Sequence, residues 1–117
     1  MKRQFRLRRA GDYARLRREG RKHRHPFFVV SLVFNNLPHN RYGFITAKRL
    51  GNAVMRNRVR RLLRESVRLL HPNLTPGFDV VIIARSPVVG ESFLTVQNAL
   101  KETLRRAGMI DDEGNQR

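Results

Sequence analysis

Residues 48–65 read KRLGNAVMRNRVRRLLRE, and the rest of the chain can be placed around this stretch. Successive residues of an α-helix are rotated by about 100°, so each side chain can be assigned to a face. From Met55 onward, one arc holds the apolar residues Met55, Val59, Leu62, Leu63, Val67, Leu69 and Leu70. The opposite arc holds Arg56, Asn57, Arg60, Arg61, Arg64 and Arg68. This separation predicts an amphipathic helix with one face for a protein core and one for a polyanion.

Both ends of this helix carry boundary signals. Gly51 supplies a turn, and Asn52 is a good N-cap because its side chain can accept a backbone N–H bond. At the other end His71 precedes Pro72, and the residue before a proline is sterically pushed out of helical geometry. We therefore expect a helix over residues 53–70.

Three stretches rich in β-branched and aromatic residues predict strands, at residues 27–34, 41–48 and 78–84. Residues 35–40 are dense in turn formers, so we expect the first two strands to pair as a hairpin. Residues 78–84 (FDVVIIA) are almost all apolar, as in an interior strand that is covered on both faces. The helix before them makes a crossover, which predicts that the second and third strands are parallel.

The two ends of the chain predict helices as well. Residues 1–9 form a basic arm, Asp12 is expected to cap a short helix that ends at Gly20, and residues 21–25 are expected to be a basic linker. Ser92 is expected to cap a last helix that ends near residue 107, and Gly108 is its expected stop. Residues 109–117 are expected to be a frayed tail.

These elements predict an α+β fold. We expect a two-layer sandwich in which helices pack on a small mixed β-sheet, in the order α-β-β-α-β-α. The crossover helix carries the Arg-Asn-Arg motif of residues 56–58. At 117 residues, the chain is expected to form a single domain over residues 1–117.

Charge is the property that points to a partner. The chain has 25 Lys and Arg against nine Asp and Glu, a net charge of +16, and its isoelectric point is about 11.9. Such an excess is typical of a nucleic-acid-binding protein, and the arginines offer planar forks that match phosphate. No basic helix carries a Trp or Phe face, which disfavours a membrane-surface role. The sequence shows no membrane span and no signal peptide, so we expect a cytoplasmic protein without a membrane partner.

The residue pattern disfavours catalysis by the chain itself. There is no cysteine, so thiol catalysis, disulfides and Cys-ligated zinc are excluded. Nucleases that use metal ions usually cluster carboxylates, whereas the acids here are isolated, as are the histidines. We expect no catalytic residue, no metal ligand and no small-molecule substrate. A helix-turn-helix is disfavoured because a strand and a glycine turn, rather than a helix, precede the basic helix.

RNA contact fits the basic helix better. Arginines recur every four residues from Arg56 to Arg68, about 6 Å apart along the axis, which roughly matches the spacing of phosphates. Asn57 adds an amide for a phosphate, a 2′-hydroxyl or a base edge, and Lys48 and Arg49 extend the patch. On the sequence alone, Tyr13 is read as an aromatic residue of the core or its rim rather than as an RNA contact. Two alternatives stay open, namely a binding module of another ribonucleoprotein, such as a ribosomal protein, and a free-standing RNA nuclease.

The same stretch, 48–65, closely resembles the signature of the bacterial ribonuclease P protein family. Leu7 with Asp12 and Tyr13 is similar to the family's first helix, residues 26–29 (PFFV) are similar to its first strand, and residues 79–85 (DVVIIAR) to its last. The resemblance implies an α+β fold with a cleft between the sheet and the first helix. It implies a protein subunit of an endoribonuclease whose catalytic RNA, using Mg²⁺, removes the 5′ leader from precursor tRNA. Its partners would be that catalytic RNA and precursor tRNA, and the Mg²⁺ would be held by RNA.

The resemblance also implies roles for particular residues. By position, contact with the catalytic RNA falls on Lys48, Arg56, Asn57, Arg58, Arg60, Arg61 and Arg64, and Tyr13 and Val29 fall in the leader cleft. Two positions of that cleft depart from the family, because Arg17 and Ser31 stand where an aromatic residue is often found. The resemblance therefore implies a thinner stacking platform here, with leader contact that depends more on charge and on salt.

Overall fold

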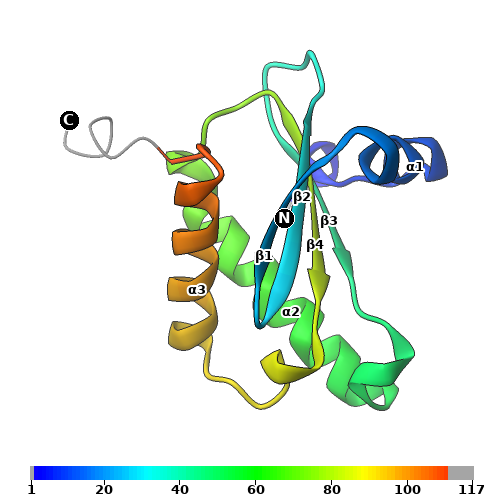
Figure 1. Cartoon of the computed structure of the whole chain (residues 1–117), viewed down its shortest axis with the longest axis vertical. Helices are drawn as coiled ribbons and strands as arrows, with labels where there is room; N and C mark the ends of the chain where they lie inside the picture. Colours follow the sequence, from blue (N-terminus) through cyan, green and yellow to red (C-terminus); the bar gives the residue numbers. More distant parts are fainter. Residues whose placement is uncertain (1, 111–117) are drawn as a thin grey trace.

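The structure, a computed structural model, describes residues 2–110, in which four strands form a single sheet. Three helices accompany the sheet in the described chain. Figure 1 shows the sheet nearly edge-on, with α3 on one side and α1 on the other. In chain order the elements are α1 (Ala10–Glu19), β1 (Arg21–His25), β2 (Phe28–Phe34), β3 (Arg41–Ile45), α2 (Ala53–Leu70), β4 (Phe78–Ala84) and α3 (Phe93–Arg106). The predicted α+β class with a mixed sheet is confirmed.

The strand order is β1-β2-β4-β3, so β4 is an interior strand, as its apolar sequence predicted. β3 and β4 are parallel and are joined through α2, which confirms the predicted crossover. The predicted hairpin between the first two apolar strands is wrong, because β4 lies between β2 and β3 and pairs with β2 in antiparallel fashion. A strand that is apolar on both faces must be covered on both sides, and the centre of the sheet provides this.

Residues 21–25, expected to be a linker, form the edge strand β1. This strand pairs with β2 from Arg21 opposite Leu32 to His25 opposite Phe28, so the hairpin of this fold is β1–β2. Its sequence, RKHRH, has no apolar alternation, so the strand signal was missing. Backbone pairing with β2 supplies the stability instead, and a charged edge strand discourages pairing with other chains.

One face of the sheet, together with α2 and α3, encloses the main core. Phe28, Val30, Val80 and Ile82 of the sheet are fully or almost fully buried, and they belong to the same cluster as the apolar stripes of the two helices. Two of the three predicted caps are confirmed, since the side chain of Asn52 accepts from the backbone N–H of Met55 and that of Ser92 from the backbone N–H of Thr95. The predicted apolar arc of α2 is wrong at its edges, where Met55 and Leu69 are exposed.

The other face of the sheet carries α1 and a smaller cluster of Leu7, Leu16 and Val81. The helix starts at Ala10, and its N-cap, Arg9, makes no side-chain capping bond. The predicted cap by Asp12 is therefore wrong. Its carboxylate instead lies 3.4 Å from the guanidinium of Arg41, so it ties α1 to the sheet.

Parts of the predicted basic arm and of the predicted tail pack against the rest of the described structure. Leu7 is buried, its N–H donates to the carbonyl of Tyr42, and residues 3–5 form a short 3-10 helix, so the basic arm is docked along β3. Met109 and Ile110 are buried, and the carbonyl of Met109 accepts from the N–H of Thr75. The frayed-tail prediction is wrong for these two residues, and its remainder, 111–117, lies outside the described residues. That residues 1–117 form a single domain stays a prediction.

A buried carboxylate joins these parts. Asp79 on β4 is fully buried and accepts from Nε of Arg41 at 2.8 Å and from its Nη2 at 2.7 Å. Asn35, in the loop after β2, donates to the same carboxylate at 3.0 Å. Arg15 of α1 lies 3.8 Å from it and also donates to the carbonyl of Phe34. One side chain thus connects α1, β3, β4 and the loop after β2.

We predict that Asp79→Ala lowers the free energy of unfolding by about 3 kcal/mol, because removing one partner of a buried ion pair leaves the other without compensation. Urea denaturation followed by circular dichroism measures this change. The matched control is Glu102→Ala, which removes an exposed carboxylate paired with Arg105 and should cost less than about 1 kcal/mol. Equal losses in the two variants would contradict the central role of Asp79.

Candidate nucleic-acid interface

The solvent-facing side of α2 carries a row of polar and basic side chains, which we call the arginine row. Asn57, Arg61 and Arg68 are exposed, and Arg64, one turn before Arg68, is half-buried. Val59, Leu63, Ser66, Val67 and Leu70 fix the opposite side in the core. Because the helix is anchored along most of its length, these basic groups are presented from a rigid support.

Lys48 and Arg49 are exposed in the 3-10 turn Lys48–Leu50, just before α2. Leu50 is buried and anchors the turn. Gly51 follows with a φ of 139°, a value that favours glycine, and a Cβ there would lie 2.7 Å from the sulfur of Met55. The turn therefore places both basic residues at the N-terminal end of α2, next to the arginine row.

Arg60 and Arg56 lie on the flank of α2, with less exposure than Arg61. Arg60 donates to Oδ1 of Asn57 at 2.7 Å and also to the hydroxyl of Thr46, just after β3. The Nε of Arg56 is buried and has no hydrogen-bond partner within the described residues. Arg60 thus has a structural role in addition to its charge, since it connects α2 to the end of β3.

Arg60 and Arg64 meet Arg6 of the N-terminal arm around a depression of about 150 Å³, which we call the arginine depression. It is lined by Arg6, Leu7, Tyr13, Tyr42, Gly43, Phe44, Arg60 and Arg64, with no acid among them. Burial, and then the positive charges of Arg6, Arg60 and Arg61, lower the pKa of Arg64 below its ordinary value. Converging guanidinium groups without a carboxylate are suited to hold an anion such as phosphate.

Tyr13 of α1 lies at the junction of two depressions. Its hydroxyl donates to the carbonyl of Leu7 at 3.3 Å, and its ring covers Gly43, where a Cβ would come within 2.4 Å of the hydroxyl. Burial, with a smaller effect of Asp12, raises the pKa of the Tyr13 hydroxyl. Tyr13 lines both the arginine depression and a second hollow between α1 and the sheet. It therefore lies at a rim between depressions rather than in the core.

The second hollow, which we call the cleft, has a volume of about 100 Å³ and mainly apolar walls. Its lining residues are Tyr13, Leu16, Arg17, Lys22, Ser31, Ile45, Val81 and Ile83. Three of the four predicted leader-cleft residues, Tyr13, Arg17 and Ser31, are therefore brought together here. The fourth, Val29, is two residues from Ser31 along β2 and is paired with Ile83, so it extends the same face of the sheet.

Ser31 explains why this cleft has little room for an aromatic floor. Its side chain is buried and its hydroxyl donates to the carbonyl of Leu16 at 3.4 Å. A Cβ at Gly20 would lie 2.2 Å from that hydroxyl, so α1 ends directly against β2. The floor is aliphatic, and exposed Arg17 and Lys22 give the rim its positive charge.

Of the predicted RNA-binding residues, Arg60 and Arg64 line the arginine depression, and two of the others border different hollows. Arg58 lies on the other flank of α2, beside Val88 and Glu91, where it lines a separate hollow of about 200 Å³. Arg68 forms an ion pair with Glu65, with Nη2 and Oε1 2.6 Å apart, so its charge is partly compensated. The arginines predicted to bind RNA are thus divided among more than one surface.

Arg6 and Lys22 were not predicted as site residues. Arg6 belongs to a basic arm that gave no positional signal, and its location depends on the bridge between Arg6 and Tyr42. Lys22 lies in the unpredicted strand β1, opposite Ser31. The charge of both was visible in the sequence, but their places followed from long-range pairing.

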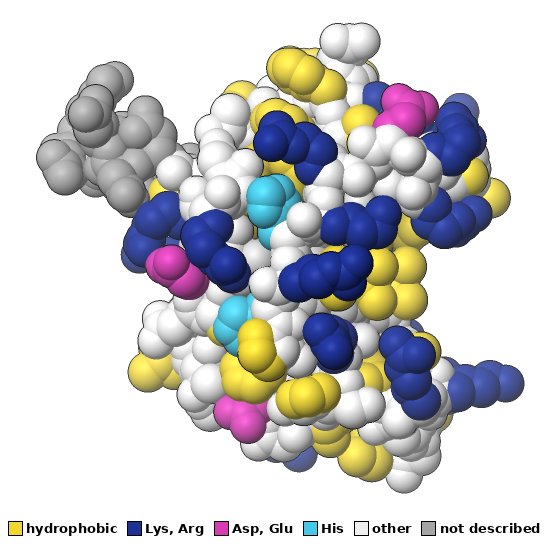
Figure 2. Space-filling view, viewed as in Figure 1, with side chains coloured by type: hydrophobic (Ala, Val, Ile, Leu, Met, Phe, Trp, Pro, Cys, Tyr) yellow, Lys and Arg dark blue, Asp and Glu magenta, His cyan; other side chains and the backbone are white. Residues whose placement is uncertain are grey.

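Basic side chains outnumber acidic ones on the face shown in Figure 2.

Two acidic side chains share one arginine as a partner. Asp12 and Asp79 both contact the guanidinium of Arg41, which compensates their charge. The described residues contain no group of three or more His, Asp and Glu that could hold a metal ion. Among these same residues, no helix combines the length and the apolar character that crossing a bilayer requires.

Known proteins share this sequence and fold. The Ribonuclease P family model matches residues 1–108. The ribonuclease P protein component of Roseiflexus sp. (strain RS-1) is 46% identical over 111 residues, which is 94% of this chain and 91% of that protein. That of Exiguobacterium sp. is 41% identical over 97% of this chain and 99% of its own length.

Solved structures agree with the sequence relatives. The RNase P protein of Staphylococcus aureus superposes with a TM-score of 0.84 at 30% identity, over 92% of this chain and 98% of that one. The RNase P protein of Thermotoga maritima gives a TM-score of 0.81 at 30% identity, over 86% of this chain and 96% of that one. The chain therefore belongs to the ribonuclease P protein family.

Proposed function

We propose that this protein is the RNA-binding subunit of ribonuclease P, which binds the catalytic RNA and the 5′ leader of precursor tRNA and so promotes maturation of the tRNA 5′ end. The observation that carries the proposal is the continuity of two surfaces. The arginine depression and the cleft share Tyr13, and basic side chains border both. A protein of this family with such a surface can hold a folded RNA and a single strand together.

The rigid arginine row of α2 suits the catalytic RNA. A folded RNA presents phosphates at fixed positions, and a helix anchored in the core can match them without losing conformational freedom. Lys48, Arg49, Asn57, Arg61 and Arg64 are the residues that we assign to this contact. Arg56, Arg58, Arg60 and Arg68 support it from the flanks and the C-terminal end of the helix.

The cleft suits the single-stranded leader. Its aliphatic floor of Ile45, Val81 and Ile83 can cover the faces of unpaired bases, and Arg17 and Lys22 at the rim can meet the phosphates. Tyr13 is the aromatic residue there that can stack on a base. Because the rim is basic and the floor carries no aromatic ring, leader binding should depend strongly on salt.

The chemistry is assigned to the RNA in this proposal. Mg²⁺ would be held by the catalytic RNA and the substrate, and the arginines of the protein would reduce the repulsion between their phosphates. This protein then contributes binding and positioning of the substrate, in the cytoplasm where tRNA is processed. Asp12 and Asp79 both lie against the guanidinium of Arg41, which gives these two carboxylates a structural role.

We predict that the protein lowers the Mg²⁺ concentration at which the catalytic RNA cleaves precursor tRNA, because bound arginines take over part of the charge screening. Cleavage is measured at a series of Mg²⁺ concentrations, with the catalytic RNA alone, the protein alone and both together. Cleavage by the protein alone would show a free-standing nuclease. An unchanged Mg²⁺ requirement would favour a module of another ribonucleoprotein.

A second prediction concerns the arginine row. Arg61→Ala and Arg64→Ala should each weaken binding of the catalytic RNA and lower the slope of log affinity against log salt, by up to about one unit for each lost phosphate contact. Arg60→Ala is less informative, because it also breaks the bonds to Asn57 and Thr46.

The control for this series is Lys101→Ala, which removes one positive charge from an exposed position of α3. It changes the net charge by the same amount and should leave the salt slope nearly unchanged. Filter-binding titrations at several salt concentrations give both quantities. If the α2 variants match this control, the arginine row does not contact RNA.

A further inference from the structure

A depression of about 300 Å³ lies between the N-terminal arm and the C-terminal end of α2, separate from the cleft. Its lining residues are Lys2, Phe5, Tyr42, Arg68 and His71, and we call it the Phe5–His71 pocket. The volume is at the lower limit of the sites that hold small molecules, about 300–1,000 Å³. The proposed function makes no use of this pocket beyond Arg68.

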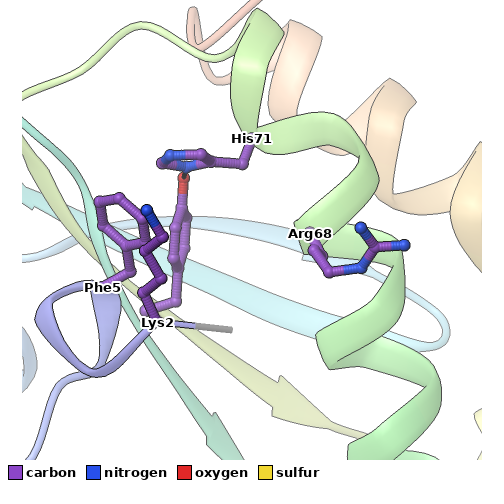
Figure 3. Close-up of a pocket in the computed structure, with 5 residues that line it drawn as sticks. Lys2, Phe5, Arg68 and His71 are labelled. Carbon is purple, nitrogen blue, oxygen red and sulfur yellow. Dashed lines mark hydrogen bonds between the residues drawn. The ribbon is translucent and has the colours of Figure 1, made fainter.

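The walls of the pocket are aromatic. The ring centroids of Phe5 and His71 are 4.6 Å apart, and those of Tyr42 and His71 are 5.6 Å apart with nearly perpendicular planes. His39 lies behind Phe5, with ring centroids 5.5 Å apart. Figure 3 shows Lys2 and Phe5 side by side below His71, whereas Arg68 lies across the opening and points away from them. Rings from the arm, β3 and the end of α2 thus surround one hollow.

A hydrogen-bond chain fixes the ring of His71. The amide of Asn40 donates to the hydroxyl oxygen of Tyr42 at 3.2 Å, and that oxygen lies 2.7 Å from Nδ1 of His71. This short contact between the Tyr42 oxygen and Nδ1 holds the imidazole in place with either ring tautomer. Burial raises the pKa of Tyr42 to about 12, and burial together with the charge of His39 lowers the pKa of His71. Both shifts favour the uncharged form of the ring concerned.

The rim of the pocket is positively charged. Lys2 and Arg68 are exposed, and no acidic residue is among the lining side chains. Arg68 is paired with Glu65, so a phosphate would meet Lys2 directly and would compete with Glu65 for Arg68. An aromatic hollow with cations at its rim matches the two parts of a nucleotide. The base can stack on the rings, and the phosphates on either side of it can meet the ammonium and the guanidinium.

The position of the pocket extends the surface described above. Tyr42 lines both this pocket and the arginine depression, which in turn shares Tyr13 with the cleft. Three hollows therefore follow one another, and each shares a tyrosine with the next. A single strand bound at the cleft or at the arginine depression has a neighbouring place for one more base.

We propose that the Phe5–His71 pocket binds one unpaired nucleobase of an RNA strand, with the adjoining phosphates at Lys2 and Arg68. The binding chemistry is that of a nucleotide and stands independently of which RNA supplies it. The identity of that RNA, leader or catalytic RNA, rests on the proposed function.

Nuclear magnetic resonance of the histidine rings tests the pocket with a small probe. The chain has four histidines, of which His39 and His71 contact Phe5, whereas His23 and His25 lie on β1. Titration of the full chain with adenosine 5′-monophosphate should shift the ring signals of His39 and His71 far more than those of β1. Ribose 5-phosphate, which lacks the base, should not. Equal shifts with both compounds, or equal shifts at all four histidines, would overturn the proposal.

Phe5→Leu is the informative variant, because it keeps an apolar side chain against the core while it removes the stacking ring. It should weaken binding of adenosine 5′-monophosphate about tenfold, as expected for the loss of one stacked base. Phe34→Leu is the matched control. Phe34 is 64% exposed and stacks on Phe78 instead of lining the pocket, so its replacement should leave nucleotide binding unchanged. Thermal unfolding of both variants verifies that they are folded.

Two RNA titrations identify the source of the base. The affinity of Phe5→Leu is measured for precursor tRNA with its leader and, separately, for the catalytic RNA. One of the two should bind about tenfold more weakly than it binds the unmodified protein, and that RNA supplies the base. If the affinities of both RNAs are unchanged, the pocket does not bind an RNA base and the proposal fails. The proposed function is tested separately, since stimulation of cleavage by the unmodified protein does not depend on this outcome.

Discussion

A fully buried carboxylate, that of Asp79, connects α1, β3, β4 and the loop after β2, and the first three of these elements line the cleft. It accepts hydrogen bonds from Nε and Nη2 of Arg41 and from the side-chain amide of Asn35, and it lies 3.8 Å from the guanidinium of Arg15 on α1. A charge without access to water is tolerated only when such partners compensate it, so these groups must come together in the folded state. Helix α1 is thereby held against this face of the sheet, and the cleft is the hollow between them.

The same arrangement explains how a small basic protein can present more than one kind of surface. The main core, between the sheet and helices α2 and α3, makes the arginine row of α2 rigid. The smaller cluster under α1 leaves aliphatic side chains such as Ile45 partly exposed beside Arg17 and Lys22. Docking of the N-terminal arm on β3 then adds Arg6 to the arginines of α2. Phosphate contacts and base contacts would therefore fall on adjoining but chemically distinct patches.

Local sequence patterns predicted much of this fold and part of the site. The helix over 53–70 with its Asn52 cap and the interior strand at 78–84 followed from periodicity and capping, because these signals act over a few residues. The strand β1 and the position of β4 between its neighbours could not be predicted in this way, since backbone pairing between distant residues decides them. Asp12 read as a helix cap for the same reason, because its partner Arg41 lies far along the chain. The arginines of α2 were found from their spacing, whereas Arg6 and Lys22 depended on tertiary structure.

The central claim is that the cleft binds the 5′ leader, whereas the arginine row binds the catalytic RNA. Site-specific cross-linking tests this claim most directly. The chain has no cysteine, so single cysteines can carry a photoactivatable group without a background signal. Arg17→Cys places the group at the rim of the cleft, and Arg61→Cys places it on the exposed side of α2. In the complex of protein, catalytic RNA and precursor tRNA, the first should cross-link to the 5′ leader and the second to the catalytic RNA. Cross-links from both positions to the same RNA, or the reverse assignment, would contradict the account.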